Sequence, residues 1–593
     1  MAKYTALTFA PVQGFIEKSR KLRDLYGSSF LISYLAEAIC KEAIRLKYEV
    51  ISPALIKVIQ GTPNQIIIQG NLEEKLAKKA MQKAWLAVTE NCRLWIQNKV
   101  QDCGQYYWGR NWESWGNYAW EFFWGSGETI GAAREAVNDA KRSRDWTGIN
   151  WTGESSTLSG ADGVAWPGMG IGNPQKTNRH KQKQEIAAFY ERLSYELGKA
   201  FIDETPELII PAHELDEKRK EYGEAFVDPD EELSIPELIK RLITHLAIAK
   251  QIVNPLKEEI EPKVSNLLKK LEKELNPKSF TDLSRLKHKN SKSKDSPEKE
   301  YWTGWFQGDG DRMGDLLKRL SQNSITEPDE LKKFSRSMME WGEDKFKPAI
   351  AEASGRTVYA GGDDFMGIFY RLPENTPSTQ KYTPLTGQEC VNWFSSKFPS
   401  IWQLHGQPIT VSVGLVWTAP NVPQRDVLQQ CRLAETSAKN NGKDRMAIRI
   451  LFNGGTHIEW VCPWWCLPVL QQYQDRDKDT LKSLTPPAEG KKTKPNWTHI
   501  YNDVATLESR HAFKGNTQIA EELFKIYFPD CEEWIKPDNW WLHSHAGKLR
   551  TGILGHEEED AKKEAHELFN EWFINLAKVG FHLCRATQTL LQG

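Results

Sequence analysis

The sequence lacks several features that would assign it to a familiar class. Only nine of its 593 residues are cysteine, and no two form a C-x-x-C pair, so neither a zinc ribbon nor a disulfide scaffold is expected. No run of about 20 mostly apolar residues is present, which argues against a membrane-spanning helix. Residues 1–21 combine a short apolar strand with charges, unlike a signal peptide. We therefore expect a cytoplasmic protein with reduced thiols.

The sequence also lacks an excess of charge of either sign. Lys and Arg number 78 against 79 Asp and Glu, for a formal net charge of −1. A chain that coats nucleic acid over its whole surface is therefore excluded, and contacts with RNA must come from local patches. Apolar residues are present at 39%, enough for several cores. At about 150 residues per domain, the length predicts roughly four domains.

Polar segments with few aliphatic residues divide the chain. Residues 287–300 (KHKNSKSKDSPEKE) have the composition of a linker, because they can bury little apolar surface. Similar segments at 373–387 and 485–495 indicate an insertion and a break. We expect an α+β domain, a mainly helical domain, the linker, a second α+β domain and a C-terminal helical domain, at residues 1–150, 151–286, 287–300, 301–456 and 457–593.

The segment after the linker has a clear order of elements. Hydrophobic periodicity predicts a strand, a helix, a hairpin, a helix and a strand, with one more helix and strand appended. The expected ranges are 302–307, 328–352, 356–360, 365–370, 391–398, 408–417, 425–439 and 446–451. This order is that of a ferredoxin-like βαββαβ core. The strands at 4–10 and 65–69 flank a helical stretch in a similar way, so a related second α+β domain is expected.

Aspartates follow the first central strand and fill the hairpin. Asp309 lies in the motif GDGD (308–311), and Asp363 and Asp364 end the motif GGDD (361–364). The first and third strands of a ferredoxin-like sheet are antiparallel neighbours, so the topology brings these three carboxylates together. Two unit charges about 4 Å apart repel by about 4 kcal/mol at an effective dielectric of 20. A bound Mg²⁺ or Mn²⁺ reverses the sign of that interaction, so we expect the three aspartates to be metal ligands and catalytic groups.

Such a site is suited to nucleotidyl transfer, because two metal ions can activate a hydroxyl and stabilise the leaving pyrophosphate. Gly310, Gly361 and Gly362 leave room for a triphosphate near the backbone. Lys443, in the sequence AKNNGK that ends the helix at 425–439, can reach phosphates from the opposite side. The alternatives are an ordinary hairpin turn for the glycines and a helix-terminal charge for the lysine. Asp311 is expected on the other side of its turn.

These motifs resemble a known family. GGDDF (361–365) with DGD (309–311) is similar to the palm domain that diguanylate cyclases share with the large subunits of type III CRISPR complexes. Residues 351–355 (AEASG) do not supply the inhibitory R-x-x-D motif of diguanylate cyclases. The run from Pro11 to Leu35 is similar to the opening of the Cmr-type large subunit of type III-B complexes. The resemblance spans residue 6 to about residue 450.

The resemblance implies an α+β fold with two ferredoxin-like domains, of the nucleotide cyclase or palm polymerase kind, and helical domains between and after them. It implies an antiviral subunit that assembles with a guide RNA and other type III-B subunits, and that joins ATP into cyclic oligoadenylate when target RNA binds. Gln13 and Ser28 of the first, non-catalytic domain would help to hold a nucleotide. The alternatives are a catalytically silent scaffold that binds nucleotide and a free-standing nucleotide cyclase.

Two features of related subunits are missing. Many relatives begin with an HD nuclease domain, but no histidine here is followed by aspartate, so HD nuclease activity is not expected. Relatives often hold zinc with a cysteine cluster, and the corresponding stretch, 153–163, has no cysteine, so no zinc is expected there. His543, His545 and His556 match no specific metal spacing and stay unassigned.

A run of tryptophans stands out in the first domain. It comprises Trp95, Trp108, Trp112, Trp115, Trp120 and Trp124. These side chains could stack on bases, but packing within an insertion or against a partner subunit is the favoured interpretation.

Overall fold

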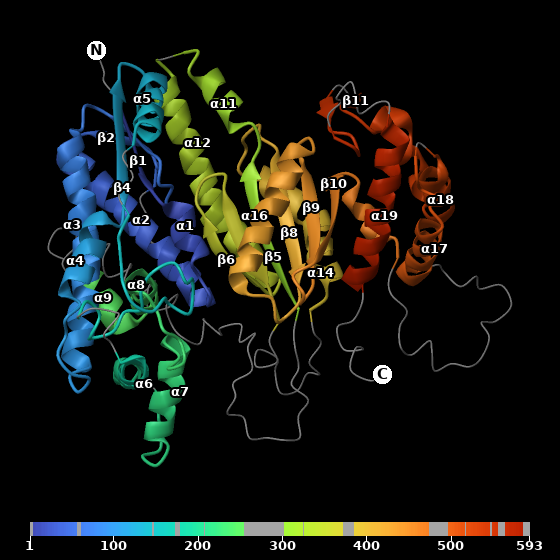
Figure 1. Ribbon diagram of the computed structural model, residues 1–593. Helices are drawn as coiled ribbons and strands as arrows, with labels where there is room; N and C mark the ends of the chain where they lie inside the picture. The colour runs from blue at the N-terminus through green and yellow to red at the C-terminus, as the bar shows by residue number, and fades with distance from the viewer. Residues whose placement is uncertain are drawn as a thin grey trace. The chain divides into compact units, whose positions relative to one another are not determined.

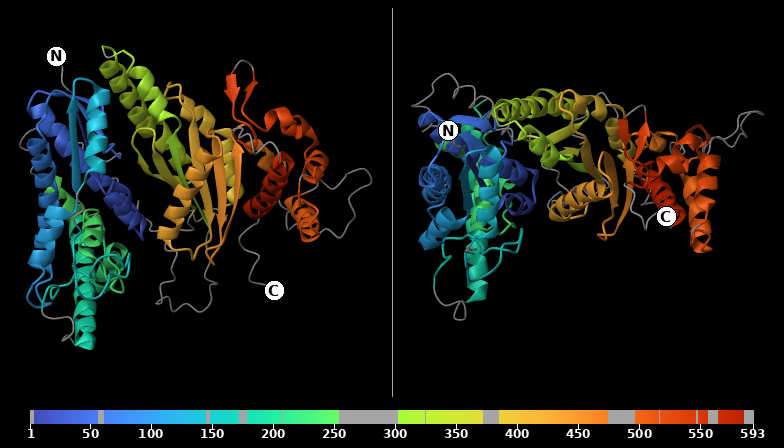
Figure 2. Two further views of the ribbon diagram at one scale, coloured as in Figure 1. Left: turned by 45° about the horizontal axis from the view of Figure 1, so that its top comes forward. Right: turned by 90° about the horizontal axis from the view of Figure 1, so that it is seen from above.

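The computed structural model forms two compact units (Figures 1 and 2). The first comprises residues 1–284 with 319–336, and the second residues 285–318 with 337–593. The structure describes residues 4–55, 61–144, 148–171, 178–206, 208–253, 302–323, 325–371, 385–473, 496–515, 517–545, 548–555 and 564–584. The expected linker, most of the segment 373–387 and all of the segment 485–495 lie outside these residues. Within them, no helix combines the length and apolar character needed to cross a membrane.

The first unit contains a four-stranded sheet in the order β2-β3-β1-β4. Its strands are β1 (Tyr4–Ala10), β2 (Glu49–Ser52), β3 (Ile66–Gln69) and β4 (Glu121–Gly127). Helices α1 (Val12–Glu17) and α2 (Leu22–Arg45) join β1 to β2, α3 (Glu74–Lys99) and α4 (Gly109–Tyr118) join β3 to β4, and α5 (Ile130–Arg142) follows. β1 pairs antiparallel with both β3 and β4. The sequence of elements and the strand order are those of a ferredoxin-like fold, as predicted.

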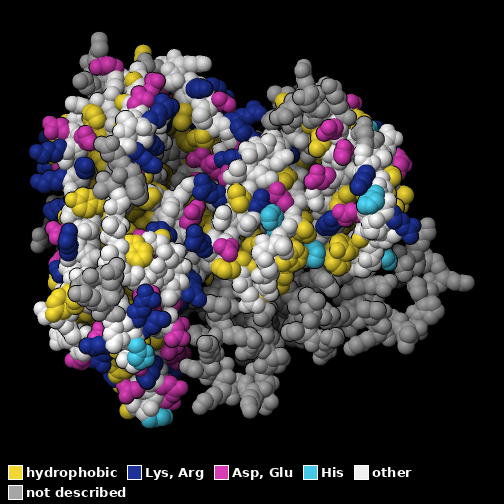
Figure 3. Space-filling view, viewed as in Figure 1, with side chains coloured by type: hydrophobic (Ala, Val, Ile, Leu, Met, Phe, Trp, Pro, Cys, Tyr) yellow, Lys and Arg dark blue, Asp and Glu magenta, His cyan; other side chains and the backbone are white. Residues whose placement is uncertain are grey.

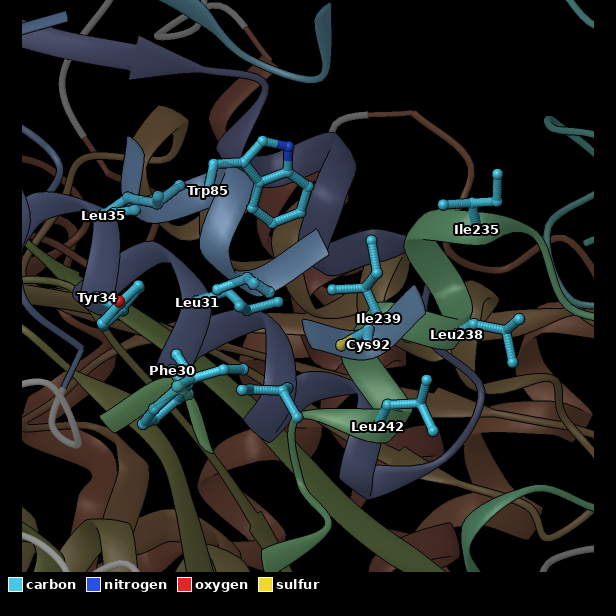
Figure 4. Packing of buried hydrophobic residues seen from close by; sticks show 14 of the residues in the cluster. Phe30, Leu31, Tyr34, Leu35, Trp85, Cys92, Ile235, Leu238, Ile239 and Leu242 are labelled. Carbon is cyan, nitrogen blue, oxygen red and sulfur yellow. The ribbon is translucent and has the colours of Figure 1, made fainter. Parts of the chain in front are cut away.

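The helices that follow share the core of this sheet. They are α6 (Arg179–Glu204), α7 (Leu215–Phe226), α8 (Ile235–Leu242) and α9 (Leu246–Val253). Side chains from α2, α3 and α8 converge in one buried cluster (Figure 4), in which Leu31, Ile239 and Leu242 are fully buried. Burying a side chain of this size contributes about 1.5–3 kcal/mol. The helical part of the first unit is therefore joined to its sheet by a continuous apolar core.

A buried ionic network joins α2 to α8 beside this core. The guanidinium of Arg241 contacts the carboxylate of Asp24 and donates to Glu231 at 2.8 Å, with all three side chains almost completely buried. Burial alone would raise the pKa of Glu231, but the positive charges of Arg241 and Lys21 hold it at about 2. The neighbouring Lys240 donates to the carbonyl of Lys18 at 2.7 Å, which anchors the segment after α1.

The tryptophan run packs inside the first unit. Trp95, Trp108 and Trp112 are at most 4% exposed, and Trp108 stacks edge-on against Phe189 of α6. Trp120 makes similar edge contacts with Trp85. These side chains therefore pack within the core of the first unit, and not within an insertion as expected.

The second unit contains a six-stranded sheet in the order β10-β9-β8-β5-β7-β6. Its strands are β5 (Thr303–Gly310), β6 (Gly355–Ala360), β7 (Phe365–Phe369), β8 (Val411–Thr418), β9 (Arg445–Leu451) and β10 (His457–Pro463). Strand β5 lies between β7 and β8 and is antiparallel to both. The four strands β6-β7-β5-β8 repeat the order of the first sheet. The predicted α+β fold with two ferredoxin-like sheets is confirmed.

Helices cover both faces of the second sheet (Figures 1 and 2). They are a π-helical turn (Gly342–Phe346), α13 (Lys347–Glu352), α14 (Gly387–Ser396), α15 (Phe398–Gln403) and α16 (Gln424–Asn440). Helices α11 (Met313–Leu320) and α12 (Glu327–Trp341) come between β5 and this turn in the sequence, and residues 319–336, which include most of α12, belong to the first unit. Phe306 and Phe365 pack against Phe346, Phe394 and Phe398 on the face that α13, α14 and α15 cover. Helix α16 lies on the opposite face and connects the parallel pair β8 and β9.

The sheet extends past residue 456, the boundary expected from the sequence. β10 pairs antiparallel with β9, because Gly454 and Gly455 provide a tight turn and buried Trp460 and Cys462 alternate with less buried residues. The region beyond contains α17 (Trp497–Ser509), α18 (Ile519–Tyr527), α19 (Ala565–Cys584) and a hairpin of β11 (His543–His545) and β12 (Lys548–Arg550). Trp572 of α19 donates to the carbonyl of Val461 at 2.9 Å, which attaches this region to β10.

Candidate functional site

The three predicted aspartates meet at one edge of the second sheet. Asp309 lies near the end of β5, and Asp363 and Asp364 form the turn between β6 and β7. The backbone N–H of Gly310 donates to the carbonyl of Asp363 at 3.1 Å, so the pairing of β5 with β7 continues into this turn. The predicted neighbourhood of the first and third strands is therefore correct, and it brings residues 54 positions apart into contact.

Two glycines allow this close approach. A Cβ atom on Gly310 would lie 2.9 Å from the Cβ of Asp363, closer than side chains tolerate. Gly362 has a φ of +101°, a backbone conformation that favours glycine. The N–H of Gly361 donates to the carbonyl of Asp364 at 3.1 Å and closes the turn. The predicted glycines Gly310, Gly361 and Gly362 thus have structural roles in the turn, beside any role in binding a nucleotide.

The carboxyl groups lack enough positive charge around them. Burial raises the pKa of Asp363 to about 7, and the neighbouring charge of Asp309, which shares a hydrogen bond with it, adds to the rise. Burial, together with the charges of Asp309 and Asp363, raises the pKa of Asp364 well above its ordinary value. The hydroxyl of Tyr359 donates to Asp364 at 3.1 Å. Clustered buried acids with raised pKa values are typical of functional sites, because a bound cation would stabilise their ionised forms.

A lysine from α16 faces the aspartates. Lys439 contacts the carboxylate of Asp309, and its ammonium lies 3.0 Å from Glu435 one helical turn earlier. Burial alone would lower the pKa of Lys439, but these two carboxylates raise it. Glu435 and Tyr359 are site residues that the sequence reasoning missed, and of the two lysines in the AKNNGK run it selected Lys443 and not Lys439. The i, i+4 spacing of Glu435 and Lys439 was the available signal, but such pairs are common on helix surfaces.

Lys443, predicted to bind phosphate, lies one turn beyond Lys439. It follows the end of α16 in a loop whose backbone is held by an N–H bond from Lys443 to the carbonyl of Ala438 at 3.2 Å. Its side chain is half-buried. The described contacts to the aspartates therefore come from Lys439, and a role for Lys443 stays a prediction.

The donor set suits a divalent cation in kind, although it is not arranged as a formed metal site. Among the residues that the structure describes, no group of three or more His, Cys, Asp or Glu is positioned to hold a metal ion. In the present geometry Lys439 neutralises Asp309. Mg²⁺ is commonly bound by one or two carboxylates together with substrate phosphates rather than by a complete protein cage, and the three clustered aspartates fit that mode.

Asp311 differs from the other three aspartates. It is 2% exposed, and its carboxylate accepts hydrogen bonds from Thr410 at 2.9 Å, Ser412 at 2.7 Å and the N–H of Asp444 at 2.9 Å. The donors come from Thr410 just before β8, from Ser412 in β8 and from the loop after α16. The carboxylate of Asp311 is therefore bound within the fold, and the described contacts do not join it to Asp363 or Asp364, in keeping with the expected change of side at this turn.

The predicted nucleotide-binding residues of the first unit differ in exposure. Gln13 lies exposed in the first turn of α1. Ser28 is completely buried in α2, where its hydroxyl donates to the carbonyl of Asp24 at 2.7 Å. A buried hydroxyl with a satisfied hydrogen bond offers no surface to a ligand in this conformation, so of the two only Gln13 is accessible.

The histidine set stays unassigned. His543 is partly buried, and its Nδ1 lies 2.9 Å from the carbonyl oxygen of Trp541. His545 ends β11, where it pairs with Lys548. His556 lies outside the described residues. The prediction of no zinc at 153–163 is likewise untested, because no ligand is part of the structure.

Comparisons with known proteins match both sheets. Residues 303–447 match the family model for the second palm domain of Cas10/Cmr2, and residues 4–102 match the N-terminal model of the CRISPR-associated protein Cmr2. No curated protein matches the chain at the level of sequence.

Solved structures resemble the fold over nearly the whole chain. The apo state of a type III-B Cmr-beta complex contains a chain with 11% identity and a TM-score of 0.52, covering 97% of this chain and 81% of that one. The Cmr-beta complex bound to cognate target RNA gives 11% identity and a TM-score of 0.50, with 98% and 83% covered. A Csm1–Csm4 cassette with cA4 gives 14% identity, 98% and 70% coverage and a TM-score of 0.41. Two models of the Cas10/Cmr2 family thus match this chain in order along its sequence, and its fold is similar to that of a chain in a type III-B Cmr-beta complex.

Proposed function

We propose that this chain is the catalytic large subunit of a type III-B complex, which joins ATP into cyclic oligoadenylate, or a related adenylate, when target RNA binds. The observation that carries the proposal is the gathering of Asp309, Asp363 and Asp364 beside Lys439, with the carboxyl pKa values of Asp363 and Asp364 raised. Uncompensated acids at the edge of a palm-type sheet suit a reaction that brings metal-bound phosphates to them.

The roles of the residues follow from their chemistry. When bound, Mg²⁺ or Mn²⁺ would polarise the α-phosphate and stabilise the leaving pyrophosphate. Asp309, Asp363 and Asp364 would hold the ions, and Tyr359 would orient Asp364 through its hydrogen bond. Lys439 would leave Asp309 and contact phosphate oxygens. Its ammonium group would remain in contact with Glu435. Gly310 and Gly362 would keep Cβ atoms out of the path of the triphosphate.

The proposed partners are other type III-B subunits, with guide and target RNA bound through the complex. A similar fold occurs in a Cmr-beta complex with cognate target RNA. Positive and negative side chains are interspersed over the face seen in Figure 3, in keeping with the net charge of −1. A surface of this kind fits docking on partner proteins better than independent coating of RNA.

The test is to incubate the purified complex with ATP, Mg²⁺ or Mn²⁺ and complementary target RNA, and to identify products by mass spectrometry. We expect cyclic oligoadenylate only when target RNA and metal are both present. An Asp309→Asn complex, matched in composition, serves as the control for contaminating enzymes. Absence of any adenylate product from the intact, RNA-bound complex would overturn the proposal.

A second function, a scaffold that binds nucleotide without reaction, is favoured by one observation. Lys439 already neutralises Asp309, and no metal group is complete among the described residues. Under this alternative, ATP binds to the complex with measurable affinity and remains unchanged after prolonged incubation with metal and target RNA. A free-standing cyclase, in contrast, forms product without the other subunits or RNA.

A further inference from the structure

The loop that follows α16 has an unusual backbone. Gly442, Lys443 and Asp444 have φ values of +118°, +62° and +50°, so three successive residues adopt left-handed conformations. For residues other than glycine, such conformations cost of the order of 1 kcal/mol or more each and persist only where the surroundings fix them. This loop directly continues the helix that presents Lys439 to Asp309. Its conformation therefore determines where Lys443 lies relative to the aspartates.

One side of the loop is fixed by the sheet. The N–H of Asp444 donates to the carboxylate of Asp311 at 2.9 Å, and Asp311 is itself bound by Thr410 and Ser412. Because Asp311 lies two residues after Asp309, the loop and the metal-binding end of β5 share one rigid hydrogen-bonded cluster.

The other side of the loop is fixed by residues 551–555, more than 100 positions away in the chain. The guanidinium of Arg445, 1% exposed, donates to the carbonyl of Gly552 at 2.9 Å and contacts the hydroxyl of Thr551. It also donates to the loop's own carbonyl, that of Lys443, at 3.2 Å. Arg445 thus connects the loop to the segment 551–555 through one buried side chain.

The backbones of the two segments are in direct contact. A Cβ atom on Gly442 would lie 3.0 Å from the Cα of Gly555, and one on Gly555 would lie 2.3 Å from the carbonyl oxygen of Asn441. Only glycine at both positions permits this approach. Segment 551–555 is in turn held by its own region, because Trp465 donates to the carbonyl of Thr551 at 2.9 Å and Ile553 donates to that of Asn539 at 3.0 Å.

We propose that the segment 551–555, acting through Arg445, sets the conformation of the loop 442–444 and so positions Lys443 to bind the phosphates of ATP. Arg445 and Thr551 are positioning residues, and the C-terminal region controls nucleotide binding at the palm through them. The inference rests on the proposed function of the site. It adds that the site needs a part of the chain beyond residue 447, where the match to the palm family model ends.

The test compares two buried arginines of the same strand in the full complex. Arg445→Lys shortens the connection to segment 551–555, whereas Arg449→Lys, the matched control, alters a contact with Glu459 farther along β9. We expect Arg445→Lys to raise the KM for ATP about five- to tenfold with kcat within twofold, the equivalent of about one hydrogen bond. Arg449→Lys is expected to leave KM unchanged. An unchanged KM in Arg445→Lys would overturn the inference.

A second, milder variant keeps the inference testable if Arg445→Lys does not fold. Thr551→Val preserves shape and removes only the hydroxyl that contacts Arg445, and it should raise KM about threefold. In a Lys443→Ala background the effect of Thr551→Val should vanish, because the loop would no longer present an ammonium group. Equal effects in both backgrounds would identify a merely structural role and contradict positioning of Lys443.

Hydrogen exchange separates this inference from the proposed function. In Thr551→Val complexes the amide of Asp444 should exchange faster than in the wild type, whether or not any product forms. Unchanged exchange at residues 442–444 would refute the connection itself. Faster exchange in a complex that makes no adenylate would retain the connection and refute the catalytic proposal, so the two failures are distinguishable.

Discussion

The first sheet and the strands β6-β7-β5-β8 of the second sheet have the same strand order, but the side chains at equivalent positions differ in charge. The last paired residues of the first and third strands are Leu7 and Ile66 in one sheet and Gly308 and Phe365 in the other. When these pairs are placed in register, Thr8 corresponds to Asp309 and Asn64 to Asp363.

In the first sheet this position is neutral and satisfied. The amide of Asn64 donates to the hydroxyl of Thr8 at 3.1 Å and to the carbonyl of Phe9 at 3.3 Å. In the second sheet the same position holds the carboxyl groups of Asp309 and Asp363, which share one hydrogen bond, and the pKa of Asp363 is raised. The shared topology therefore places the ends of the first and third strands next to each other in both sheets. The side chains at that position determine whether it contributes to the stability of the fold or binds a ligand.

The buried acids of the two units also differ in the charge of their neighbours and in the direction of their pKa shifts. Glu231 faces the buried guanidinium of Arg241, which holds its pKa at about 2. Asp363 faces another carboxylate, and burial raises its pKa to about 7. Acids that serve only the fold are paired within it, whereas acids of the candidate site are left short of positive charge.

The largest effect is expected from substituting Asp309, the residue that corresponds to Thr8 in the first sheet. Asp309→Asn should lower the rate of adenylate formation by at least about 10²–10³-fold, because a preorganised electrostatic group is lost. The matched change in the first sheet, Thr8→Ala, should leave the rate within about twofold. Rates are measured from product yield per complex under saturating target RNA. Similar losses in both variants would show that the two sheets contribute equally.

The next effect concerns acid stability. Glu231→Gln should destabilise the folded chain at pH 7 by about 3–5 kcal/mol, because it removes one partner of a buried ion pair. The depressed pKa of Glu231 means that its contribution is complete above about pH 4.5 and disappears as pH falls toward 2. In urea titrations, the stability gap between wild type and variant should close over that range. A gap that is constant with pH would contradict the pairing.

A smaller effect is expected at Asp311, the acid of the second unit that is satisfied by donors. Asp311→Asn should cost about 1–3 kcal/mol, because an amide cannot accept from all three donors. Thermal unfolding of the two Asn variants distinguishes them. Asp309→Asn relieves repulsion with Asp363 and loses an ion pair with Lys439, which Glu435 still contacts, so the melting temperature should change less than in Asp311→Asn.

The last effect is the metal-free pH dependence of Asp363. Its pKa is raised by burial, so its neutral form is favoured in the fold. The corresponding contribution to stability is complete below about pH 4 and is lost as pH rises through 7. In chelator, wild-type stability should therefore fall between pH 4 and 7 relative to Asp363→Asn. Added Mg²⁺ should reduce that difference, and parallel profiles would contradict the raised pKa.

Much of this comparison could be predicted from the sequence, because hydrophobic periodicity gives the order of helices and strands along the chain, and that order matches the ferredoxin-like topology. The alternation in 408–417 and the hairpin around GGDD were sufficient to bring Asp309 and Asp363 together. The pairing partner of Asp309 could not be predicted, since a Glu–Lys pair such as that of Glu435 and Lys439 is ordinary on any helix. The burial of Ser28 was missed because it depends on α8, which packs on α2 from 200 residues away.

Strand β10 could not be predicted from the sequence either, because it depends on pairing with another strand. Its segment contains Trp460 and Cys462 in alternation, but its neighbours are aromatic and polar residues typical of a turn. Only the presence of β9 gives it a partner, with seven paired residues from His457 to Pro463. Tertiary pairing here overrides weak local preference.

The most direct test of the central claim is product formation by the complex carrying Asp363→Asn with Asp364→Asn. Asparagine is close in size to aspartate and suits the turn, so assembly with guide RNA and other subunits should be retained. We expect adenylate products, detected by mass spectrometry under target RNA, to be absent from the variant and present in the wild type. Wild-type product yield from the assembled variant would contradict the account, because the second sheet would then not contain the active site.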